Sequence, residues 1–365
     1  MRIGVIAPLV EAVPPTLYGG TERVVSNLTE ELVRRGNEVT LFASGDSVTS
    51  AELVACTPRS LRLDPAAPDF VTATLFQLGD AYRRAGDFDI IHNHADWLGF
   101  PFADLVSTPT VTTVHGRLDI PEIAYRYRRG AHHRLVSISH DQRRFLPEVN
   151  WIATVHNGID VSRYSLRSQG GDYLVFLGRI NPDKGPDRAV EIAERTGMRL
   201  VVAAKVDPAD RDYYESYIAP LFRRSHRVEF IGEVDDAAKD QLLGGAYAYL
   251  FPIDWPEPFG ITMIEAMATG TPVIATACGS VPEVLADGET GFVCHSVAEM
   301  VAAVERVPCI DRRACRQRVE QLFSTARMAD GYEAVYAQLL SDQCGEARPF
   351  KAGSANGARS SAAVS

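Results

Sequence analysis

The sequence predicts an α/β protein built from two doubly wound, Rossmann-like units that face a central cleft. Short apolar runs rich in β-branched residues alternate with amphipathic helical patterns along almost the whole chain. Most of these runs lack strict polar–apolar alternation, as expected for parallel strands covered by helices on both faces. A polar, glycine-rich stretch at residues 163–172 interrupts the series and divides it into two halves.

The first half opens with a strand at residues 2–8 and a helix at residues 21–36, with Thr21 as a candidate N-cap and Gly36 ending the helix. The other elements expected in this half are strands at residues 38–43, 88–94, 110–115, 133–139 and 151–160, and a helix at residues 75–84.

The second half repeats the pattern. Its expected strands lie at residues 173–178, 199–204, 228–232, 248–252 and 271–276, and its expected helices at residues 186–195, 210–219, 235–243 and from about residue 260. A last amphipathic helix is expected at residues 324–340, and a tail rich in Gly, Ala and Ser, residues 345–365, is expected to be disordered. We therefore expect an N-terminal domain at residues 1–164 and a C-terminal domain at residues 165–323.

Length and composition exclude several classes of protein. A chain of 365 residues is too long for one ordinary core, which favours two domains. The net charge of −10 argues against a nucleic-acid-binding protein. The sequence contains no long uncharged apolar run, so we expect no membrane span. Its first ten residues are typical of a strand rather than a signal peptide. Six cysteines without paired spacing favour a cytoplasmic protein.

The stretch PIDWPEPFGITMIE, residues 252–265, has features of an anion site at the start of a helix. Pro256 and Pro258 stiffen the loop, and Gly260 allows a ligand to approach the backbone. The first turn, with Ile261 and Thr262, offers unpaired N–H groups and the positive end of the helix dipole. Such an end can bind a diphosphate.

Two carboxylates, Glu257 and Glu265, bracket this helix start. Glu265 can accept two hydroxyl donors of a ribose, and Glu257 can hold hydroxyls of a second ring. The alternative is that Glu265 pairs with a core arginine while Glu257 lies on the surface.

Two cations follow the first strand of the second half. Arg179 and Lys184 lie in the stretch FLGRINPDKG, at the carboxyl edge of the predicted sheet, where ligands bind in such folds. Two cations there can neutralise a diphosphate. The alternative is a pair of ordinary solvated charges close to Asp183.

Gly19 and Gly20 stand between the first strand and the first helix, which indicates either an ordinary turn or a close approach of phosphate to the backbone. The stretch does not match the G-x-G-x-x-G fingerprint, which disfavours an NAD-dependent oxidoreductase.

His115 follows a strand at its carboxyl end and is the histidine best placed to contact a substrate. The pair His92 and His94 is compatible with a metal site, but no Cys pair or H-E-x-x-H motif supports one, so we expect no metal.

Residues 126–134, RYRRGAHHR, form a basic run that Arg143 and Arg144 extend. It is either a solvated helix face or a weak peripheral contact with an acidic acceptor or with anionic lipid headgroups at the inner face of the membrane.

Taken together, these motifs resemble the family-4 glycosyltransferases of the GT-B fold over residues 1–340. The resemblance rests on YGGTERVV, DIIHNH, TVHG, SISH, HNGID, FLGRINPDKG, FIGEV, EPFGITMIEAMATGTPVIAT and GSVPEVLADGETGFV. It implies retaining transfer of a sugar from a nucleoside-diphosphate donor, with a UDP-sugar favoured, to an unknown glycan, lipid or small-molecule acceptor. It also implies no cofactor or catalytic metal, and a final helix that packs back on the N-terminal domain.

The resemblance also implies roles for particular residues. Glu265 would hold the donor ribose, Glu257 the transferred sugar, and Arg179 with Lys184 the diphosphate, near Gly20. The implied catalytic residues are His115, Arg179, Lys184 and Glu257, and the implied donor-binding residues are Gly19, Gly20, Arg179, Lys184, Lys205, Val234, Glu257, Phe259, Gly260, Ile261, Thr262 and Glu265. Lys205 departs from the small residue of many relatives, and it either contacts the phosphate or base or faces water.

Other activities remain open on the residues alone. A sugar-nucleotide epimerase would need acid/base carboxylates in the cleft and no acceptor. A non-catalytic sugar-nucleotide-binding protein would keep Arg179 and Lys184 without turnover.

Overall fold

The chain forms two lobes, each built on one parallel sheet, in a computed structural model that describes residues 1–66 and 68–346. The seven-stranded sheet of the N-terminal lobe has the order β3-β2-β1-β4-β5-β6-β7, and the six-stranded sheet of the C-terminal lobe has the order β10-β9-β8-β11-β12-β13. All their strand pairs are parallel, which confirms the predicted fold class.

The strands of the N-terminal lobe are β1 (Arg2–Ile6), β2 (Glu38–Ser44), β3 (Glu52–Thr57), β4 (Ile90–Asn93), β5 (Thr110–Val114), β6 (Arg134–Ser137) and β7 (Trp151–Thr154). Those of the C-terminal lobe are β8 (Tyr173–Arg179), β9 (Arg199–Lys205), β10 (Val228–Gly232), β11 (Ala248–Phe251), β12 (Val273–Thr276) and β13 (Gly291–Cys294).

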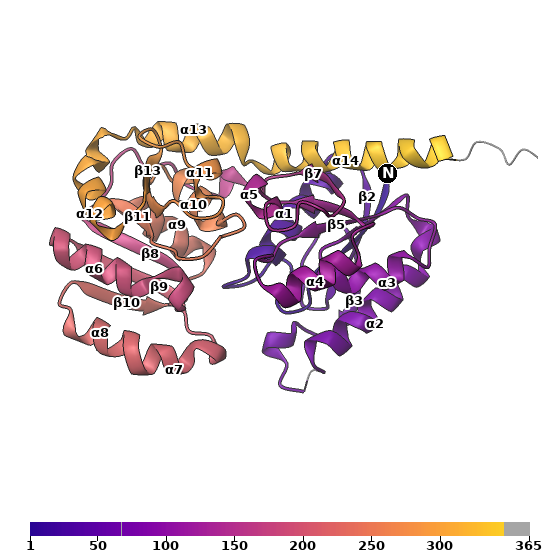
Figure 1. Cartoon of the computed structure of the whole chain (residues 1–365), viewed down its shortest axis with the longest axis horizontal. Coiled ribbons are helices and arrows are strands. Elements are labelled where there is room, and N and C mark those ends of the chain that lie inside the picture. The colour runs from indigo at the N-terminus through magenta and orange to yellow at the C-terminus, as the bar shows by residue number, and fades with distance from the viewer. Residues whose placement is uncertain (67, 347–365) are drawn as a thin grey trace, which may run out of the picture.

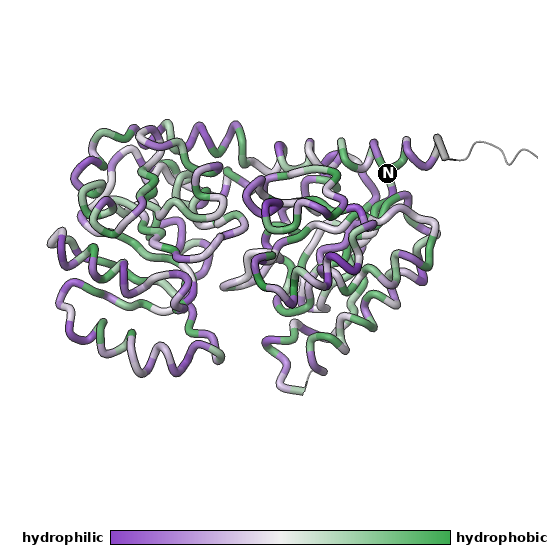
Figure 2. The backbone as a smooth tube through the Cα atoms, viewed as in Figure 1, coloured by the Kyte–Doolittle hydropathy of each residue, from purple (hydrophilic) through white to green (hydrophobic). Residues whose placement is uncertain are grey.

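Helices cover both sheets. Those of the N-terminal lobe are α1 (Gly20–Arg34), α2 (Phe70–Arg83), α3 (Phe100–Ala103), α4 (Pro121–Arg129) and α5 (His140–Arg143). Those of the C-terminal lobe are α6 (Pro186–Thr196), α7 (Arg211–Tyr213), α8 (Ala219–Arg224), α9 (Asp236–Gly245), α10 (Ile261–Ala268), α11 (Val281–Val284), α12 (Val297–Arg306) and α13 (Arg312–Leu322). Apolar and polar residues alternate along most of these helices (Figure 2), as expected where one face meets a sheet.

The strand order reverses beside β1 in the first sheet and beside β8 in the second. In doubly wound sheets, ligands bind beyond the carboxyl ends of the strands at such a reversal. The loop with Gly19 and Gly20 follows β1, and Lys184 follows β8, so both stretches lie where the fold favours a ligand.

The last helix, α14 (Thr325–Glu346), leaves the C-terminal lobe and lies along the N-terminal lobe, where Figure 1 shows it in yellow. Its buried residues recur at helical spacing and join the core of the first sheet: Met328, Ala329, Tyr332, Val335, Tyr336 and Leu339. Two hydroxyls anchor it, because Tyr336 Oη lies 2.7 Å from Nδ1 of His92 and Tyr332 Oη accepts from Oγ1 of Thr113 at 3.0 Å. The predicted crossing of the final helix is confirmed.

Some expected boundaries were wrong. β3 was missed, because its apolar run, LVAC, is short and belongs to an edge strand whose side chains are only partly buried. The helix expected at residues 210–219 is broken into α7, a π-helical turn at Tyr214–Ile218 and α8. α2 begins at Phe70, where Asp69 caps it, rather than at residue 75.

The final helix runs to Glu346, so the first two residues of the expected disordered tail are helical. The remaining tail, residues 347–365, lies outside the described residues. Among the described helices, none combines the length and apolar character that crossing a membrane requires.

Candidate active site

A cavity of about 520 Å³ lies between the lobes and is lined by loops at the carboxyl edges of both sheets. All the predicted site residues line it: Gly19, Gly20, His115, Arg179, Lys184, Lys205, Val234, Glu257, Phe259, Gly260, Ile261, Thr262 and Glu265. Residues up to 246 positions apart in the sequence, Gly19 and Glu265, therefore meet around one space large enough for a small ligand.

The start of α10 faces this cavity. Gly260 precedes the helix with φ of 74°, in the left-handed region that favours glycine, and a Cβ there would lie 2.7 Å from Cε of Met263. Oγ1 of Thr262 lies 2.8 Å from the hydroxyl of Tyr249 on β11, which fixes the first turn against the sheet. The first-turn N–H groups of Ile261 and Thr262 thus belong to a backbone with a defined position at the cavity wall.

Lys184 reaches the cavity from a short 3₁₀ turn, Pro182–Lys184, which Asn181 caps. Its ammonium forms an ion pair with Oε2 of Glu257 and lies 4.6 Å from the centre of the Trp255 ring. The cation is thus held between a carboxylate and an aromatic face. Asp183, the alternative partner from the sequence, pairs instead with Arg117, at 2.9 Å.

Arg179 is the last residue of β8 and keeps 38% of its side chain exposed. Its Nε lies 3.1 Å from Oδ2 of Asp210, but the two atoms are not aligned for a hydrogen bond. Oδ1 of Asp210 accepts from the amide of Asn181 at 2.9 Å. The Arg179 guanidinium therefore has donors left for an anion in the cavity.

Glu265 is only 2% exposed, and its charge is balanced inside the protein. Its Oε1 accepts from Nζ of Lys239 at 2.5 Å and from the hydroxyl of Tyr164 at 2.9 Å. Its partner is therefore a lysine of α9, not the core arginine of the alternative interpretation. Among the described residues, both hydrogen bonds reach the same oxygen, which leaves Oε2 for a ligand hydroxyl.

Glu257 is buried, so the alternative in which it lies on the surface is wrong. The loop that carries it is held by backbone contacts: its N–H donates to the carbonyl of Trp255, and its carbonyl accepts from the N–H of Ser280 at 2.9 Å. These contacts hold the backbone of Glu257 at the cavity wall, and the ion pair with Lys184 holds its carboxylate.

Gly19 and Gly20 of the N-terminal lobe and Lys205 of the C-terminal lobe also line the cavity. A Cβ at Gly19 would lie 2.7 Å from Cβ of Pro15, whereas one at Gly20 would meet no atom within 4 Å, so Gly20 borders open space. Lys205 pairs with Asp207 at 3.1 Å and lies 5.4 Å from the ring centre of Tyr18 in the other lobe. Lys205 therefore does not simply face water.

His115 borders the cavity as an uncharged group. Burial lowers the pKa of its imidazole to about 4, and its Nε2 lies 2.8 Å from Nδ1 of His94. At neutral pH His115 can donate or accept one hydrogen bond but supplies no charge.

Both ring nitrogens of His92 have hydrogen-bond partners, Tyr336 and Oγ1 of Thr113. The interpretation of His92 and His94 as metal ligands therefore finds no free nitrogen on His92.

Sequence reasoning missed four buried polar residues that also line the cavity: Glu22, Arg23, Asn157 and Lys239. Burial raises the pKa of Glu22 to about 7. Glu22 and Arg23 lie side by side in the first turn of α1, next to the Gly19–Gly20 stretch, and this position was a signal for them. Lys239 gave no signal, because only the folded chain brings α9 against Glu265.

Ion pairs link the two lobes around the cavity. Arg23 of α1 binds Asp236 of α9 at 2.7 Å, and Arg117 binds Asp183 at 2.9 Å. At the side of α11, the carboxylate of Glu283 accepts from the N–H of Asp141 at 2.6 Å. These contacts join the two lobes around the cavity.

The basic run at residues 126–134 lies on α4 and the loop after it, outside the cavity. The Arg126 guanidinium lies 4.8 Å from the ring centre of Trp97, and Arg128 pairs with Glu148 at 2.6 Å. Both arginines thus have partners within the protein, and the membrane contact stays a prediction.

Two family models match the chain in succession. "Glycosyltransferase Family 4" matches residues 18–163, and "Glycosyl transferases group 1" matches residues 161–310. The two matches meet between β7 and β8, where the chain passes from one lobe to the other.

Known proteins match over almost their whole lengths. Glycogen synthase of Mycobacterium tuberculosis is 27% identical over 92% of this chain and 94% of its own. Phosphatidyl-myo-inositol mannosyltransferase of Mycobacterium leprae is 26% identical over 93% of this chain and 96% of its own. The crystal structure of Anabaena Alr3699/HepE in complex with UDP superposes with a TM-score of 0.72 at 17% identity, over 93% of this chain and 100% of that one, which shows the shared fold. With both lobes and both family models matched, the chain belongs to the family-4 glycosyltransferases and has their GT-B fold.

Proposed function

We propose that this glycosyltransferase takes its sugar from a nucleoside diphosphate, with UDP-sugars favoured, and transfers it to a hydroxyl acceptor with retention of configuration. The observation that carries the proposal is the meeting of Arg179, Lys184 and the start of α10 on one cavity that Glu257 and Glu265 also line. Cations and a helix N-terminus favour a diphosphate, and carboxylates favour sugar hydroxyls.

The charges of the site suit the leaving group. As the glycosidic bond to the diphosphate breaks, negative charge grows on the phosphate oxygens, and Arg179, Lys184 and the first-turn N–H groups of α10 would stabilise it. The leaving phosphate would take the acceptor's proton on the face where the new bond forms. Glu257 would hold hydroxyls of the transferred sugar, and His115, as a neutral imidazole, would hydrogen-bond the same sugar.

Glu265 would bind the ribose through Oε2, because Lys239 and Tyr164 occupy Oε1. Val234 and Lys205 would lie beside the base. Gly20 would admit the diphosphate close to the first turn of α1, and Gly19 and Phe259 would shape the walls. Under this assignment residues 165–323 carry the donor, and residues 1–164 receive the acceptor.

A UDP donor is supported by the UDP bound in the structurally similar Anabaena protein. The names of the two mycobacterial relatives indicate different kinds of acceptor. The similarity to them therefore does not identify the acceptor of this protein. Free thiols at Cys56, Cys278, Cys294, Cys309 and Cys315 support a reducing, cytoplasmic setting.

A donor panel tests the proposal. UDP-, GDP-, ADP- and dTDP-sugars are compared by thermal shift and by release of the nucleoside diphosphate, with and without acceptor hydroxyls. We expect the sugar nucleotides of one base to stabilise the protein, and the release of their nucleoside diphosphate to depend on an acceptor. The anomeric configuration of the product, read by NMR, should match that of the donor. Inverted product would contradict retention. Acceptor-independent conversion of the sugar would indicate an epimerase, and binding without turnover a binding protein.

A further inference from the structure

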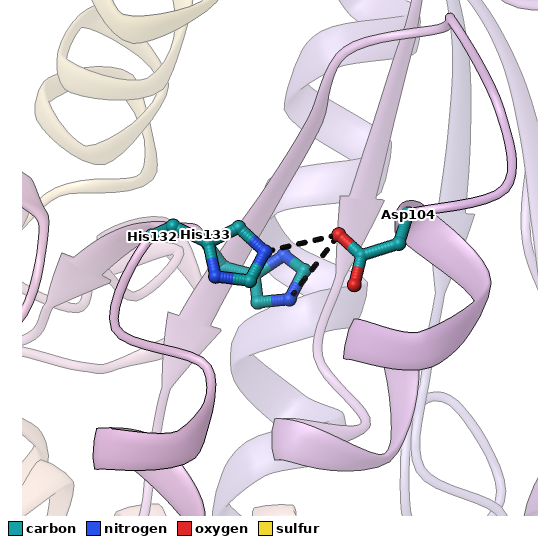
Figure 3. Close-up of side chains that lie close together, drawn as sticks. All are labelled: Asp104, His132 and His133. Atoms are coloured by element: carbon teal, nitrogen blue, oxygen red, sulfur yellow. Dashed lines mark hydrogen bonds and ion pairs between the residues drawn. The ribbon is translucent and has the colours of Figure 1, made fainter.

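A second group of chemically active side chains lies on the N-terminal lobe, apart from the cavity. Asp104 directly follows α3, and His132 and His133 lie in the loop between α4 and β6. Figure 3 shows both imidazoles turned toward one carboxylate oxygen of Asp104. Nε2 of His132 lies 3.0 Å from Oδ1, and Nε2 of His133 lies 3.7 Å from the same atom.

These separations fit the ligands of one metal ion. Two ligand atoms bound tetrahedrally at about 2.0–2.1 Å from a zinc ion stand about 3.3 Å apart. The distances of 3.0 Å and 3.7 Å bracket that value, and the three candidate ligand atoms all lie within 4.8 Å of one another. Two imidazoles and a carboxylate leave a fourth position, which water can fill because half or more of the side chains of Asp104 and His132 is exposed.

The histidines are held in place before any ion arrives. The ring of His133 stacks on Phe100 with centroids 4.3 Å apart and 16° between the planes, and only 10% of its side chain is exposed. The ring of His132 lies 4.1 Å from that of His133. The loop is fixed too, since the N–H of His133 donates to Gly130 and the carbonyl of His132 accepts from Asn150. Such preorganisation lowers the entropic cost of binding.

A salt bridge alone explains this arrangement less well. Only one of the two contacts is a hydrogen bond: Nε2 of His132 lies 3.0 Å from Oδ1 of Asp104, whereas Nε2 of His133 faces the same oxygen from 3.7 Å. At 3.7 Å a ring nitrogen is too far from a carboxylate oxygen for a hydrogen bond, but this separation suits two ligands of one metal ion. One cation between the three groups would be coordinated by all of them.

We propose that Asp104, His132 and His133 form a binding site for one divalent transition-metal ion of the zinc type, completed by water. The ion would join the end of α3 to the loop that follows α4, and so stabilise this side of the N-terminal lobe. The site takes no part in sugar transfer, and the proposal does not depend on the donor or acceptor.

The test uses the full chain, freed of any affinity tag and of metal by chelation, then titrated with Zn²⁺ by calorimetry. We expect one equivalent to bind tightly, and His132→Ala and Asp104→Asn to weaken this binding by about 100-fold or more. The matched controls are His226→Ala, an exposed histidine of the C-terminal lobe, and His156→Ala, from the other candidate trio of His140, His156 and Glu283. Both controls should bind as the parent does.

Spectroscopy gives a second readout. Co²⁺ in place of Zn²⁺ should give the intense visible bands of a tetrahedral site, and these should vanish in His132→Ala, whose side chain is exposed and whose loss leaves the fold intact. Undiminished binding in His132→Ala and Asp104→Asn, loss of binding in His156→Ala, or no stoichiometric binding to the parent would each overturn the proposal.

Discussion

Lys184 and Glu257, 73 positions apart in the sequence, form an ion pair inside the cavity between the lobes. The pair joins the loop after β8 to the loop before α10, and neither side chain is more than 19% exposed. Because the carboxylate and the ammonium are paired, the cavity can hold both charges without a ligand. Either charge would be costly to bury alone. An incoming diphosphate must therefore draw Lys184 away from Glu257 or share it.

Lys184→Ala should abolish most donor binding. Loss of one cation aimed at the leaving group is expected to lower kcat/KM by about 100- to 1000-fold. The variant also leaves Glu257 unpaired, which should cost about 1–3 kcal/mol of stability. Thermal unfolding with and without UDP separates the two effects. Lys184→Met keeps the length of the side chain, and an undiminished UDP shift in both variants would contradict the assignment.

Glu265→Gln should weaken binding of nucleosides more than binding of phosphate. The amide keeps the shape of the side chain but loses the negative charge that Lys239 and the ribose hydroxyls share, so we expect about 10- to 100-fold weaker UDP binding. Inorganic pyrophosphate, which has no ribose, should bind the variant and the parent alike. Calorimetry with both ligands checks this, and an equal loss for both would place Glu265 at the phosphates instead.

Glu22 should make stability depend on pH. Its folded-state pKa is raised from 4.5 to about 7, so the contribution of the protonated form is fully present below about pH 4.5 and is lost as pH rises through about 7. The shift corresponds to a loss of about 3 kcal/mol at most. Glu22→Gln should remain uncharged throughout. The difference in unfolding free energy between parent and variant, followed by urea denaturation from pH 5 to 8, should therefore grow with pH; a flat difference would contradict the raised pKa.

Tyr336→Phe tests the anchoring of α14. The change removes a hydroxyl that lies 2.7 Å from Nδ1 of the fully buried His92, so it should cost about 1–3 kcal/mol. UDP binding should not change, because Tyr336 does not line the cavity. Chemical denaturation and a UDP titration of the same variant measure the two effects, and a loss of UDP affinity with unchanged stability would be the contrary outcome.

Much of the fold was predictable, because parallel strands buried on both faces carry apolar runs that the sequence displays directly. The stretch FLGRINPDKG and the loop before Gly260 were predictable as site elements for a similar reason: each joins a strand to a helix at the edge where ligands bind. β3 was not predicted, since its apolar run, LVAC, is short and lies in an edge strand whose side chains are only partly buried.

The partners of the charged residues were the part that sequence could not supply. Glu265 with Lys239, Lys184 with Glu257 and Arg117 with Asp183 are each decided by how separate elements meet. Asp183 is next to Lys184 in the sequence. In the fold, however, Asp183 pairs with Arg117 and Lys184 pairs with Glu257. Tertiary packing, rather than proximity along the chain, sets these electrostatics.

The central claim is that Arg179, Lys184 and the first turn of α10 bind one diphosphate, and a crystal structure of the UDP complex tests it most directly. The account predicts phosphate oxygens within hydrogen-bonding distance of Nζ of Lys184, of the Arg179 guanidinium and of the N–H groups of Ile261 and Thr262. A diphosphate bound elsewhere, with Lys184 still paired only to Glu257, would contradict it.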